Sequence, residues 1–565
     1  MKAKKYLLSG LLMLCFLLAG CADKEQNEVN NMANENTNNI TQAAPTATTA
    51  PTATPDATSA PTANPSLTDC PTPELTGNDL YKSYFDGVIN KFALKQFGAH
   101  NPLITQDFCA DPFALVYDGR VYLYMSTDAF EYDANGELLE NTYNTLTNVH
   151  VISSDDMVNW TDHGKVLVAG KDAAAKWANR SFAPAAACKE IDGKMKFFLY
   201  FANSGSGIGV LVGDSPVGPF TDPLGEELVK WSTPGVAGVV WLFDPAVFVD
   251  DDGTGYLYFG GGVPQGQDAN PMTARVVKLG DDMISLASDA VTIDAPCIFE
   301  DSGINKIGDT YYYSYCSNWS VPQSSKDELG LSTAQICYMT SDNPMGPFEY
   351  QGVVFQNPGD FFGNHYNNHH CLFEFNGEWY LTYHAQTLES AMGIHKLYRS
   401  VHVDKLTINE DGSIQKVIGT YGGADQLKYV NPYETFEAEM MVNSAGIKVV
   451  PSSEQAKQYG AGNNAIGNIQ KGYWTCVSGV DFGTDGATKI AASIKSNADC
   501  EKAAVAIRID ALIGETVGYL PVEAGNGEDF TERVNELMTK VTGVHDVYFV
   551  FTGEGYEIDT WKFSK

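Results

Sequence analysis

Positive charge is scarce in this chain. It contains 36 Lys and Arg residues against 70 Asp and Glu residues, which gives a formal net charge of −34 for 565 residues. Nucleic acids and anionic lipid surfaces are polyanions and are repelled by an acidic protein surface of this kind. The charge therefore excludes nucleic acid as a partner, whereas neutral polymers are unaffected by it.

Paired cysteines are also missing. The 11 cysteines are scattered along the chain and never form a Cys-x-x-Cys pair. Without Cys15 and Cys21, which belong to the N-terminal segment described next, nine remain, and an odd, scattered set is not typical of a disulfide framework. We expect these cysteines to be small buried hydrophobic residues.

The first 20 residues have the features of a targeting segment. Lysines at the start precede an apolar run from Leu7 to Leu18 that is too short to span a membrane comfortably. The run ends in Leu18-Ala19-Gly20-Cys21, which resembles a bacterial lipobox. The resemblance implies that Cys21 carries a lipid that anchors the protein at the extracellular face of the cell membrane. The alternative is an ordinary secretory signal that happens to contain a cysteine.

Residues 21–76 are rich in Asn, Thr, Ala and Pro, a composition that buries almost nothing and predicts a disordered linker. The chain that follows is too long for one hydrophobic core. We predict two domains, residues 77–428 and residues 433–565.

The first domain contains a fivefold repeat, in which a short apolar strand, a turn with glycine and a strand rich in Tyr and Phe follow one another. The five copies begin at Ala110, Phe182, Phe243, Phe299 and Asn368. One sheet per repeat predicts an all-β fold, a five-bladed β-propeller.

Equivalent positions in the five repeats carry the residues most able to do chemistry. They are Asp111, Ala183-Pro184, Asp244, Glu300 and the pair His369-His370. In a radially symmetric fold these positions meet at one axis. Three carboxylates and a histidine pair in one central pocket are typical of an enzyme.

Residues 433–565 show alternating apolar positions with turn signals every 8–12 residues. This pattern predicts a second all-β domain, a β-sandwich of the jelly-roll type.

Three segments of the repeat, CADPFALVYDGRVYLY, WLFDPAVFVDDDGTGYLYFGG and NHHCLFEFNGEWYLTYH, resemble glycoside hydrolase family 43, whose members are inverting enzymes on a five-bladed propeller. The resemblance implies that Asp111 is the general base, that Glu300 is the general acid, and that Asp244 orients the acid and raises its pKa. Inversion requires such a division, because one carboxylate activates water while an acid protonates the leaving oxygen on the opposite face of the sugar.

The same resemblance implies the substrate contacts and a metal. Trp241 and Trp319 are expected as aromatic walls, and Arg399 with Asn367 or Asn368 as hydrogen-bond partners of sugar hydroxyls. His370, next to His369, is expected at a structural calcium ion in the propeller centre; the alternative is a hydrogen-bonded core histidine.

The C-terminal segments AEMM, YWTCVSGVDFG, TGVHDVYFVF and EIDTWKF resemble a carbohydrate-binding module of family 6. The resemblance implies a structural calcium ion held by Glu437, Glu439 and Asp559; the alternative is three solvated carboxylates. The usual sugar platform of that family is an aromatic pair and an Asn. These positions hold Asn468, a Gly/Asn loop near Asn526, and Glu557, so we expect that cleft to bind sugar weakly.

The sequence thus predicts a monomeric, extracellular, lipid-anchored inverting glycosidase that needs no cofactor for its chemistry. Its expected activity is release of α-L-arabinofuranosyl side chains from arabinoxylan or xylo-oligosaccharides. A β-D-xylosidase and an endo-arabinanase remain alternatives, and a non-catalytic glycan-binding lipoprotein is the rival of another class.

Overall fold

A computed structural model describes residues 75–460 and 462–565. The predicted signal segment, Cys21 and nearly all of the predicted linker lie outside these residues. Within them the regular structure is almost entirely β, and none of the helices is long and apolar enough to cross a membrane.

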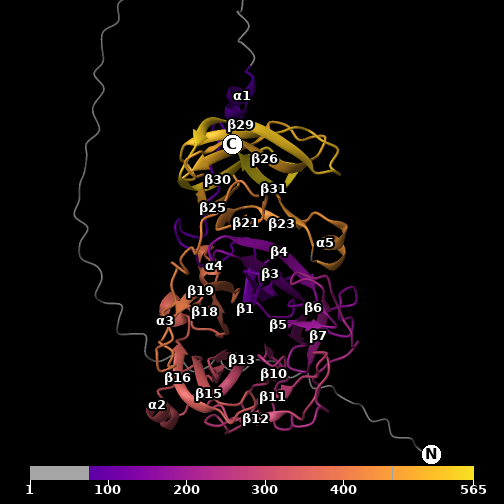
Figure 1. Cartoon of the computed structure of the whole chain (residues 1–565), viewed down its shortest axis with the longest axis vertical. Coiled ribbons are helices and arrows are strands. Elements are labelled where there is room, and N and C mark those ends of the chain that lie inside the picture. Colours follow the sequence, from indigo (N-terminus) through magenta and orange to yellow (C-terminus); the bar gives the residue numbers. More distant parts are fainter. Residues whose placement is uncertain (1–74, 461) are drawn as a thin grey trace, which may run out of the picture. The chain divides into compact units, whose positions relative to one another are not determined.

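Residues 108–406 form five antiparallel sheets, one for each repeat predicted from the sequence (Figure 1). The first sheet contains β1 (Phe108–Tyr117), β2 (Arg120–Asp128), β3 (Asn148–Ser154) and β4 (Trp160–Leu167). The second contains β5 (Phe182–Ile191), β6 (Lys194–Ala202), β7 (Ile208–Gly213) and β8 (Phe220–Thr221). The third contains β9 (Ala246–Val249), β10 (Gly255–Phe259), β11 (Ala274–Lys278) and β12 (Val291–Ile293).

The fourth sheet contains β13 (Ile298–Ile307), β14 (Thr310–Ser317), β15 (Ile336–Ser341) and β16 (Glu349–Phe355), and the fifth contains β17 (His370–Phe375), β18 (Glu378–Ala385) and β19 (Ser400–Leu406). Three short helices lie in the loops of these two sheets: α2 (Gln323–Leu329), α3 (Gly359–Phe362) and α4 (Thr387–Ala391).

The first strands of the five sheets form a closed ring of contacts. β1 contacts β5 and β17, β5 contacts β9, β9 contacts β13, and β13 contacts β17 (Figure 1). We call these five strands the inner strands and residues 108–406 the ring of sheets. Because each inner strand touches two others, the side chains at their starts share one central region.

A local irregularity turns these side chains out of the strand direction. Strand pairing is interrupted between Ala110 and Phe113 in β1, and the equivalent breaks occur in β5 and β13. Asp111 in β1 has a positive φ of 51° within such a stretch, and Asp244, two residues before β9, has a φ of 47°. Asp tolerates this left-handed region better than most residues, and a bulge of this kind re-aims one side chain.

The C-terminal domain consists of two sheets that pack face to face. One has β23 (Lys448–Pro451), β24 (Asn464–Gly467), β31 (Tyr556–Ser564), β26 (Ala487–Ser496) and β29 (Thr531–Val541), with β20 (Phe436–Glu437) paired to β31. The other has β22 (Asn443–Ala445), β25 (Trp474–Asp481), β30 (Val544–Thr552), β27 (Ala503–Ile509) and β28 (Thr516–Val522). Ile490 and Trp561 of the first sheet and Val505 and Phe549 of the second share one buried core.

Backbone pairing and a short N-terminal strap connect the C-terminal domain to the ring of sheets. β21 (Met440–Met441) extends the first sheet by pairing with β4, and α5 (Glu454–Tyr459) follows β23. Residues 77–97, which begin with α1 (Gly77–Tyr84), pack on the C-terminal domain: Phe85 lies 5.7 Å from the Tyr519 ring, and Trp474 donates to the Lys91 carbonyl. This strap was predicted as part of the first domain, and it contacts both domains, since Leu94 packs against Phe108 and Tyr398.

The eight cysteines of the described residues are all free thiols, and Cys188 is the one among them that is not fully buried. The prediction that these cysteines act as small core residues is confirmed for this part of the chain.

Candidate active site

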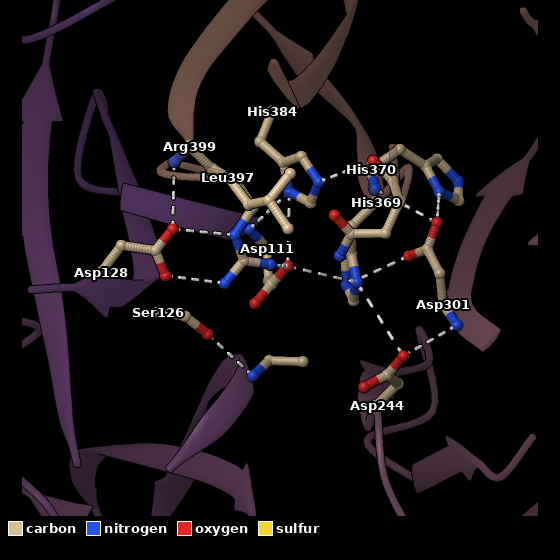
Figure 2. Close-up of polar contacts among 12 residues, drawn as sticks. Asp111, Ser126, Asp128, Asp244, Asp301, His369, His370, His384, Leu397 and Arg399 are labelled. Atoms are coloured by element: carbon tan, nitrogen blue, oxygen red, sulfur yellow. Dashed lines mark hydrogen bonds and ion pairs between the residues drawn. The ribbon is translucent and has the colours of Figure 1, made fainter. Parts of the chain in front are cut away.

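Asp111 of β1 occupies the centre of a network that also contains residues of β2 and β18 and the residue before β19 (Figure 2). Its Oδ1 accepts a hydrogen bond of 2.8 Å from Arg399 Nη1, at the start of the fifth sheet's last strand. Its backbone N–H donates to His384 Nδ1 at 3.1 Å, and His384 Nε2 lies 3.0 Å from the Asn367 carbonyl. Since Nδ1 accepts the Asp111 N–H, the ring proton of His384 resides on Nε2 and is donated to Asn367.

This network keeps Asp111 ionised. Burial by itself raises the pKa of Asp111, but the Arg399 guanidinium, His384 and His369 outweigh burial and hold the pKa well below its usual value. The carboxylate is therefore available to accept a proton at any physiological pH.

Glu300 has the opposite electrostatic environment. Burial, followed by the negative charges of Asp111 and Asp301, raises the pKa of Glu300 to about 8, against a smaller opposing effect of Arg399. Glu300 is therefore protonated at neutral pH. An ionised carboxylate and a protonated acid in one site are the two groups that acid–base cleavage of a glycosidic bond requires.

Asp244 is the third predicted carboxylate and lies with the other two. Burial, and then the charges of Glu300, Asp111 and Asp301, raise its pKa well above the usual value. After burial, the neighbours that raise the pKa of Glu300 are Asp111 and Asp301. The pKa-raising effect that was assigned to Asp244 is thus exerted on Glu300 by Asp111 and Asp301.

Asp301 is a fourth carboxylate that sequence reasoning missed. It is fully buried, has a positive φ of 70°, and donates its backbone N–H to Asp244 Oδ2 at 3.0 Å. The repeat placed Glu300 in register with Asp111 and Asp244, but the strained position of the fourth sheet is the next residue. The sequence signal was present as the adjacent acids Glu300-Asp301, of which only the first was considered.

The two histidines of the fifth repeat have different surroundings. The His369 Nδ1 atom lies 3.7 Å from Asp111 Oδ1 and 3.9 Å from Asp244 Oδ2, and its Nε2 lies 3.1 Å from Asp301 Oδ1 (Figure 2). Burial lowers the pKa of His369 and outweighs the neighbouring carboxylates. His369 therefore lies among three carboxylates at the site centre.

His370 uses both of its ring nitrogens in hydrogen bonds within the protein. Its Nδ1 is bonded to Asp301 Oδ2 and its Nε2 to Ser314 Oγ at 2.7 Å, so neither ring nitrogen has a free lone pair to offer a metal ion. In residues 75–460 and 462–565 no group of three or more His, Cys, Asp or Glu side chains is arranged to hold a metal. The geometry agrees with the alternative, a hydrogen-bonded core histidine.

Arg399 is bound to carboxylates rather than directed outward. Besides Asp111 it donates to both oxygens of Asp128, through Nε at 2.9 Å and Nη2 at 2.8 Å, and it is 2% exposed. Its predicted role as a partner of sugar hydroxyls is therefore secondary to holding the base in place. Asp128, the last residue of β2, carries no sequence signal for this role, because its partner lies 271 positions away.

Tyr143 is a second residue that the sequence did not reveal. Its ring covers the Arg399 guanidinium, with 5.0 Å from the guanidinium carbon to the ring centre, and its φ is 60°. Asn141 holds this conformation by accepting the Tyr143 N–H at 3.0 Å. Burial, and then Asp128, Asp111 and Glu300, raise the pKa of Tyr143 to about 12, against the effect of Arg399. Its hydroxyl makes no hydrogen bond with any described residue and is free for a substrate.

The predicted aromatic walls differ in how firmly they are held. Trp241 packs edge-on against Phe243 at 5.3 Å and Phe299 at 5.5 Å. These two residues directly precede Asp244 and Glu300 in the sequence. Trp319 is 38% exposed after the end of β14. Both remain candidates for sugar contacts, and Trp241 has the more fixed ring.

The two candidate asparagines are distinguished by burial. Asn368 is fully buried, and its amide nitrogen donates to the carbonyls of Ala334 and Gln356. Asn367 is partly exposed, and its backbone carbonyl holds His384. Asn367 is therefore the better candidate for a sugar contact, and Asn368 fixes the loop.

The predicted calcium ligands of the C-terminal domain form an electrostatically strained group. Glu439 is 2% exposed, and the Oε2 atoms of Glu437 and Glu439 are buried without a hydrogen-bond partner. Burial and then Glu437 raise the pKa of Glu439 well above its usual value, and burial and then Asp559 raise that of Glu437. The three side chains are not arranged as a metal-binding group in this structure. Their oxygen donors nevertheless suit Ca²⁺, and a cation would relieve both the repulsion and the unpaired oxygens.

The cleft expected to bind sugar in this domain is polar. A cavity of about 380 Å³ is bordered by Asn468 and Glu557. Lys495 forms an ion pair with Glu557 and covers the Phe530 ring at 4.9 Å. The cleft therefore lacks an open aromatic face, as its sequence predicted.

Two family models match this chain, and together they cover both of its domains. The model of the family Glycosyl hydrolases family 43 matches residues 99–414, and that of Carbohydrate binding module (family 6) matches residues 437–565. An arabinoxylan arabinofuranohydrolase of Bacillus subtilis (strain 168) is 50% identical over 488 residues, which cover 83% of this chain and 93% of the relative. An arabinoxylan arabinofuranohydrolase of Paenibacillus polymyxa is 49% identical over 482 residues, which cover 83% of this chain and 74% of the relative.

A solved structure is similar over most of the chain. The crystal structure of a family 43 arabinoxylan arabinofuranohydrolase from Bacillus subtilis in complex with cellotetraose superposes with a TM-score of 0.79 at 49% sequence identity. The match covers 84% of this chain and 99% of that structure.

Proposed function

The chain belongs to family 43 of the glycosyl hydrolases, and we propose that it is an inverting arabinofuranohydrolase that releases α-L-arabinofuranosyl side chains from arabinoxylan. The observation that carries the mechanism is the opposite protonation of two carboxyl groups in one site, with the pKa of Asp111 held low and that of Glu300 raised to about 8. The proposed substrate is that of two arabinoxylan arabinofuranohydrolases that are about 50% identical to this chain over most of its length.

The reaction needs one water molecule and these two groups. Asp111 accepts a proton from the water, whose oxygen bonds to the anomeric carbon on the face opposite the leaving group. Glu300 donates its proton to the glycosidic oxygen as the bond between that oxygen and the anomeric carbon breaks. The free sugar leaves with its anomeric configuration inverted, because attack and departure occur on opposite faces.

Neighbouring residues set the two protonation states. Arg399 and His384 hold Asp111 in position and ionised, and the negative charges of Asp111 and Asp301 favour the protonated form of Glu300. Trp241 and Tyr143 are proposed as walls for the sugar, with the free Tyr143 hydroxyl directed to a sugar hydroxyl.

The architecture proposed for this activity is a five-bladed β-propeller followed by a jelly-roll sandwich. Support for the propeller comes from the closed ring of contacts between the inner strands. In the C-terminal domain a calcium ion held by Glu437, Glu439 and Asp559 is proposed as a structural element only. Such an ion would supply positive charge to these carboxylates and takes no part in the hydrolysis.

The protein is further proposed to act as a monomer at the extracellular face of the cell membrane, tethered through lipidated Cys21. The sequence Leu18-Ala19-Gly20-Cys21 after an apolar run supports this location. A tether of residues 21–76 would leave the enzyme able to reach an external polysaccharide.

Two measurements test the proposed reaction. NMR of the first anomer released from arabinoxylan is expected to show inversion, and a retained configuration would contradict the role of Asp111. Nitrophenyl arabinofuranoside and nitrophenyl xyloside are assayed side by side; faster hydrolysis of the xyloside would favour a β-xylosidase.

The catalytic carboxylates are tested by substitution. Asp111→Ala, Asp244→Asn and Glu300→Gln are each expected to lower kcat by about a hundredfold or more, the size of a lost acid–base contribution. Circular dichroism confirms that each variant is folded. Parental activity in a folded variant would remove that residue from the proposed mechanism.

A further inference from the structure

A second cavity, of about 800 Å³, lies where the ring of sheets, the N-terminal strap and the C-terminal domain meet. We call it the seam pocket. The ring of sheets contributes Phe108, Asp128 and Phe130 to its lining, the strap contributes Phe92, and the C-terminal domain contributes Lys448 and Tyr473. None of the residues proposed to bind or cleave the arabinosyl unit lines this cavity.

The seam pocket is nevertheless adjacent to the catalytic network. Asp128 lines it and also holds the Arg399 guanidinium that positions Asp111. Phe108 lines it as the first residue of β1, three positions before Asp111. The lining of the seam pocket is thus linked to Asp111 through one pair of side chains, Asp128 and Arg399, and through three positions of β1.

The charge of the seam pocket contrasts with that of the whole protein. Three lysines line it, and only one of them has a carboxylate partner: Lys165 pairs with Asp107 at 3.0 Å. The other acid of the lining, Asp128, is already bound by Arg399. In a chain with a net charge of −34 this leaves two cations of one cavity uncompensated by a carboxylate.

These two cations, Lys91 of the strap and Lys448 of the C-terminal domain, are exposed. Lys91 Nζ lies 4.8 Å above the Tyr473 ring, and Lys448 donates a hydrogen bond to the Gln106 carbonyl. Neither forms an ion pair within residues 75–460 and 462–565. Both ammonium groups therefore have N–H donors left that an anion can accept, and neither is paired with a carboxylate.

The remaining surface of the cavity suits a sugar ring. Phe92 is 82% exposed, and Tyr473 and Phe130 are partly exposed. Flat aromatic faces of this kind pack against the apolar face of a pyranose, and the polar rim leaves hydrogen-bond partners for its hydroxyls.

From the combination of aromatic faces with two uncompensated cations, we infer that the seam pocket binds a carboxylated sugar, a uronic acid unit carried by the same polysaccharide. A neutral sugar would leave both ammonium groups without a counter-charge, whereas a uronic acid offers a ring for Phe92 and a carboxylate for Lys91 and Lys448. The inference rests on the proposed function, because it makes the pocket an accessory site for that substrate.

The test compares one polysaccharide in two charge states. Arabinoxylan that carries uronic acid groups is divided, and one half is treated with carbodiimide and borohydride to reduce the carboxyl groups to neutral alcohols. At low ionic strength the parent enzyme is expected to show a KM for the acidic polymer about three- to tenfold lower, the size that two exposed ion pairs give. The two kcat values should agree, and about 0.5 M NaCl should close the gap in KM by screening.

The variant Lys91→Gln/Lys448→Gln removes the two charges and keeps hydrogen-bond donors at both positions. It is expected to give equal KM values for the two polymers and parental activity on nitrophenyl arabinofuranoside, which is too small to reach the seam pocket. The matched control, Lys194→Gln/Lys562→Gln, removes one exposed lysine from each domain away from the pocket and should keep the gap in KM.

Two results would overturn the inference: a parent enzyme that treats both polymers equally, or a double variant that keeps the parental gap. Failure of the proposed function is recognised separately, as no release of arabinose from either polymer or from the nitrophenyl substrate. In that case affinity electrophoresis in gels that contain each polymer still tests the pocket, with stronger retardation of the parent than of the double variant by the acidic polymer as the expected result.

Discussion

The ion pair between Arg399 and Asp111 gives the sharpest test of the electrostatic argument. Two unit charges about 4 Å apart interact by about 4 kcal/mol at an effective dielectric constant of about 20, and about 1.4 kcal/mol corresponds to one pKa unit. Arg399 Nη1 lies 2.8 Å from Asp111 Oδ1 in a buried site. Since His384 and His369 remain, we expect loss of the guanidinium to raise the pKa of Asp111 by about two to three units.

The substitution has to leave no buried charge without a partner. Arg399→Gln alone would leave the Asp128 carboxylate uncompensated, at a cost of about 3–5 kcal/mol in stability. Arg399→Gln/Asp128→Asn avoids this cost, and Asp128→Asn alone is the control that keeps the pair of Arg399 with Asp111.

The assay is the pH profile of kcat/KM for nitrophenyl arabinofuranoside. The base must be ionised, so a raised pKa of Asp111 moves the acid limb of the profile to higher pH, where the assay can follow it. The acid must be protonated, and the pKa of Glu300, about 8 in the parent and lowered by Arg399, should rise too, which moves the alkaline limb in the same direction. A folded double variant whose two limbs coincide with those of the control would refute the assignment of Arg399 to the base.

Three further outcomes are expected. Tyr143→Phe should raise KM for nitrophenyl arabinofuranoside about two- to tenfold with little change in kcat, as loss of one hydrogen bond to the sugar predicts; an unchanged KM would exclude the hydroxyl from substrate binding. Cys21→Ser should move the protein from the detergent phase to the aqueous phase or leave it unprocessed, and parental partitioning would contradict the lipid anchor. Calcium should raise the melting temperature of the parent and a chelator should lower it, because an ion that binds only the folded state stabilises it; Glu437→Gln/Glu439→Gln should be insensitive to both, and equal sensitivity would place the ion elsewhere.

Much of the fold was predictable because its signals lie in short segments of the sequence. Each repeat carries its own apolar strand, turn and aromatic strand, and the five sheets appear at the predicted places. The two β-sheets of the C-terminal domain were likewise predictable from alternating apolar residues and turn signals. The N-terminal strap was not predicted to lie on that domain, since its contacts, such as Phe85 with Tyr519, join residues far apart in the chain.

Some residues of the candidate site were likewise predictable from the sequence, and others were not. Asp111, Asp244 and Glu300 could be found from the sequence because they occupy repeated positions, and their environments agree with the roles assigned to two of them. Asp301 was missed because the bulge in β13 advances the strained position by one residue, which no spacing rule reveals. His370 was expected at a calcium ion because of the family resemblance, and only the structure shows both of its nitrogens bonded to the protein.

By itself, the sequence determined which residue types stand at the start of each inner strand, and with them the class of chemistry. Only the tertiary structure decided which of these carboxyl groups is ionised and which is protonated. The reason is that a pKa in a buried site depends on the neighbours in space: Arg399 reaches Asp111 from 288 positions away, and Asp128 in turn fixes Arg399. The seam pocket has the same origin, because its lysines come from segments that approach one another only when the two domains pack together.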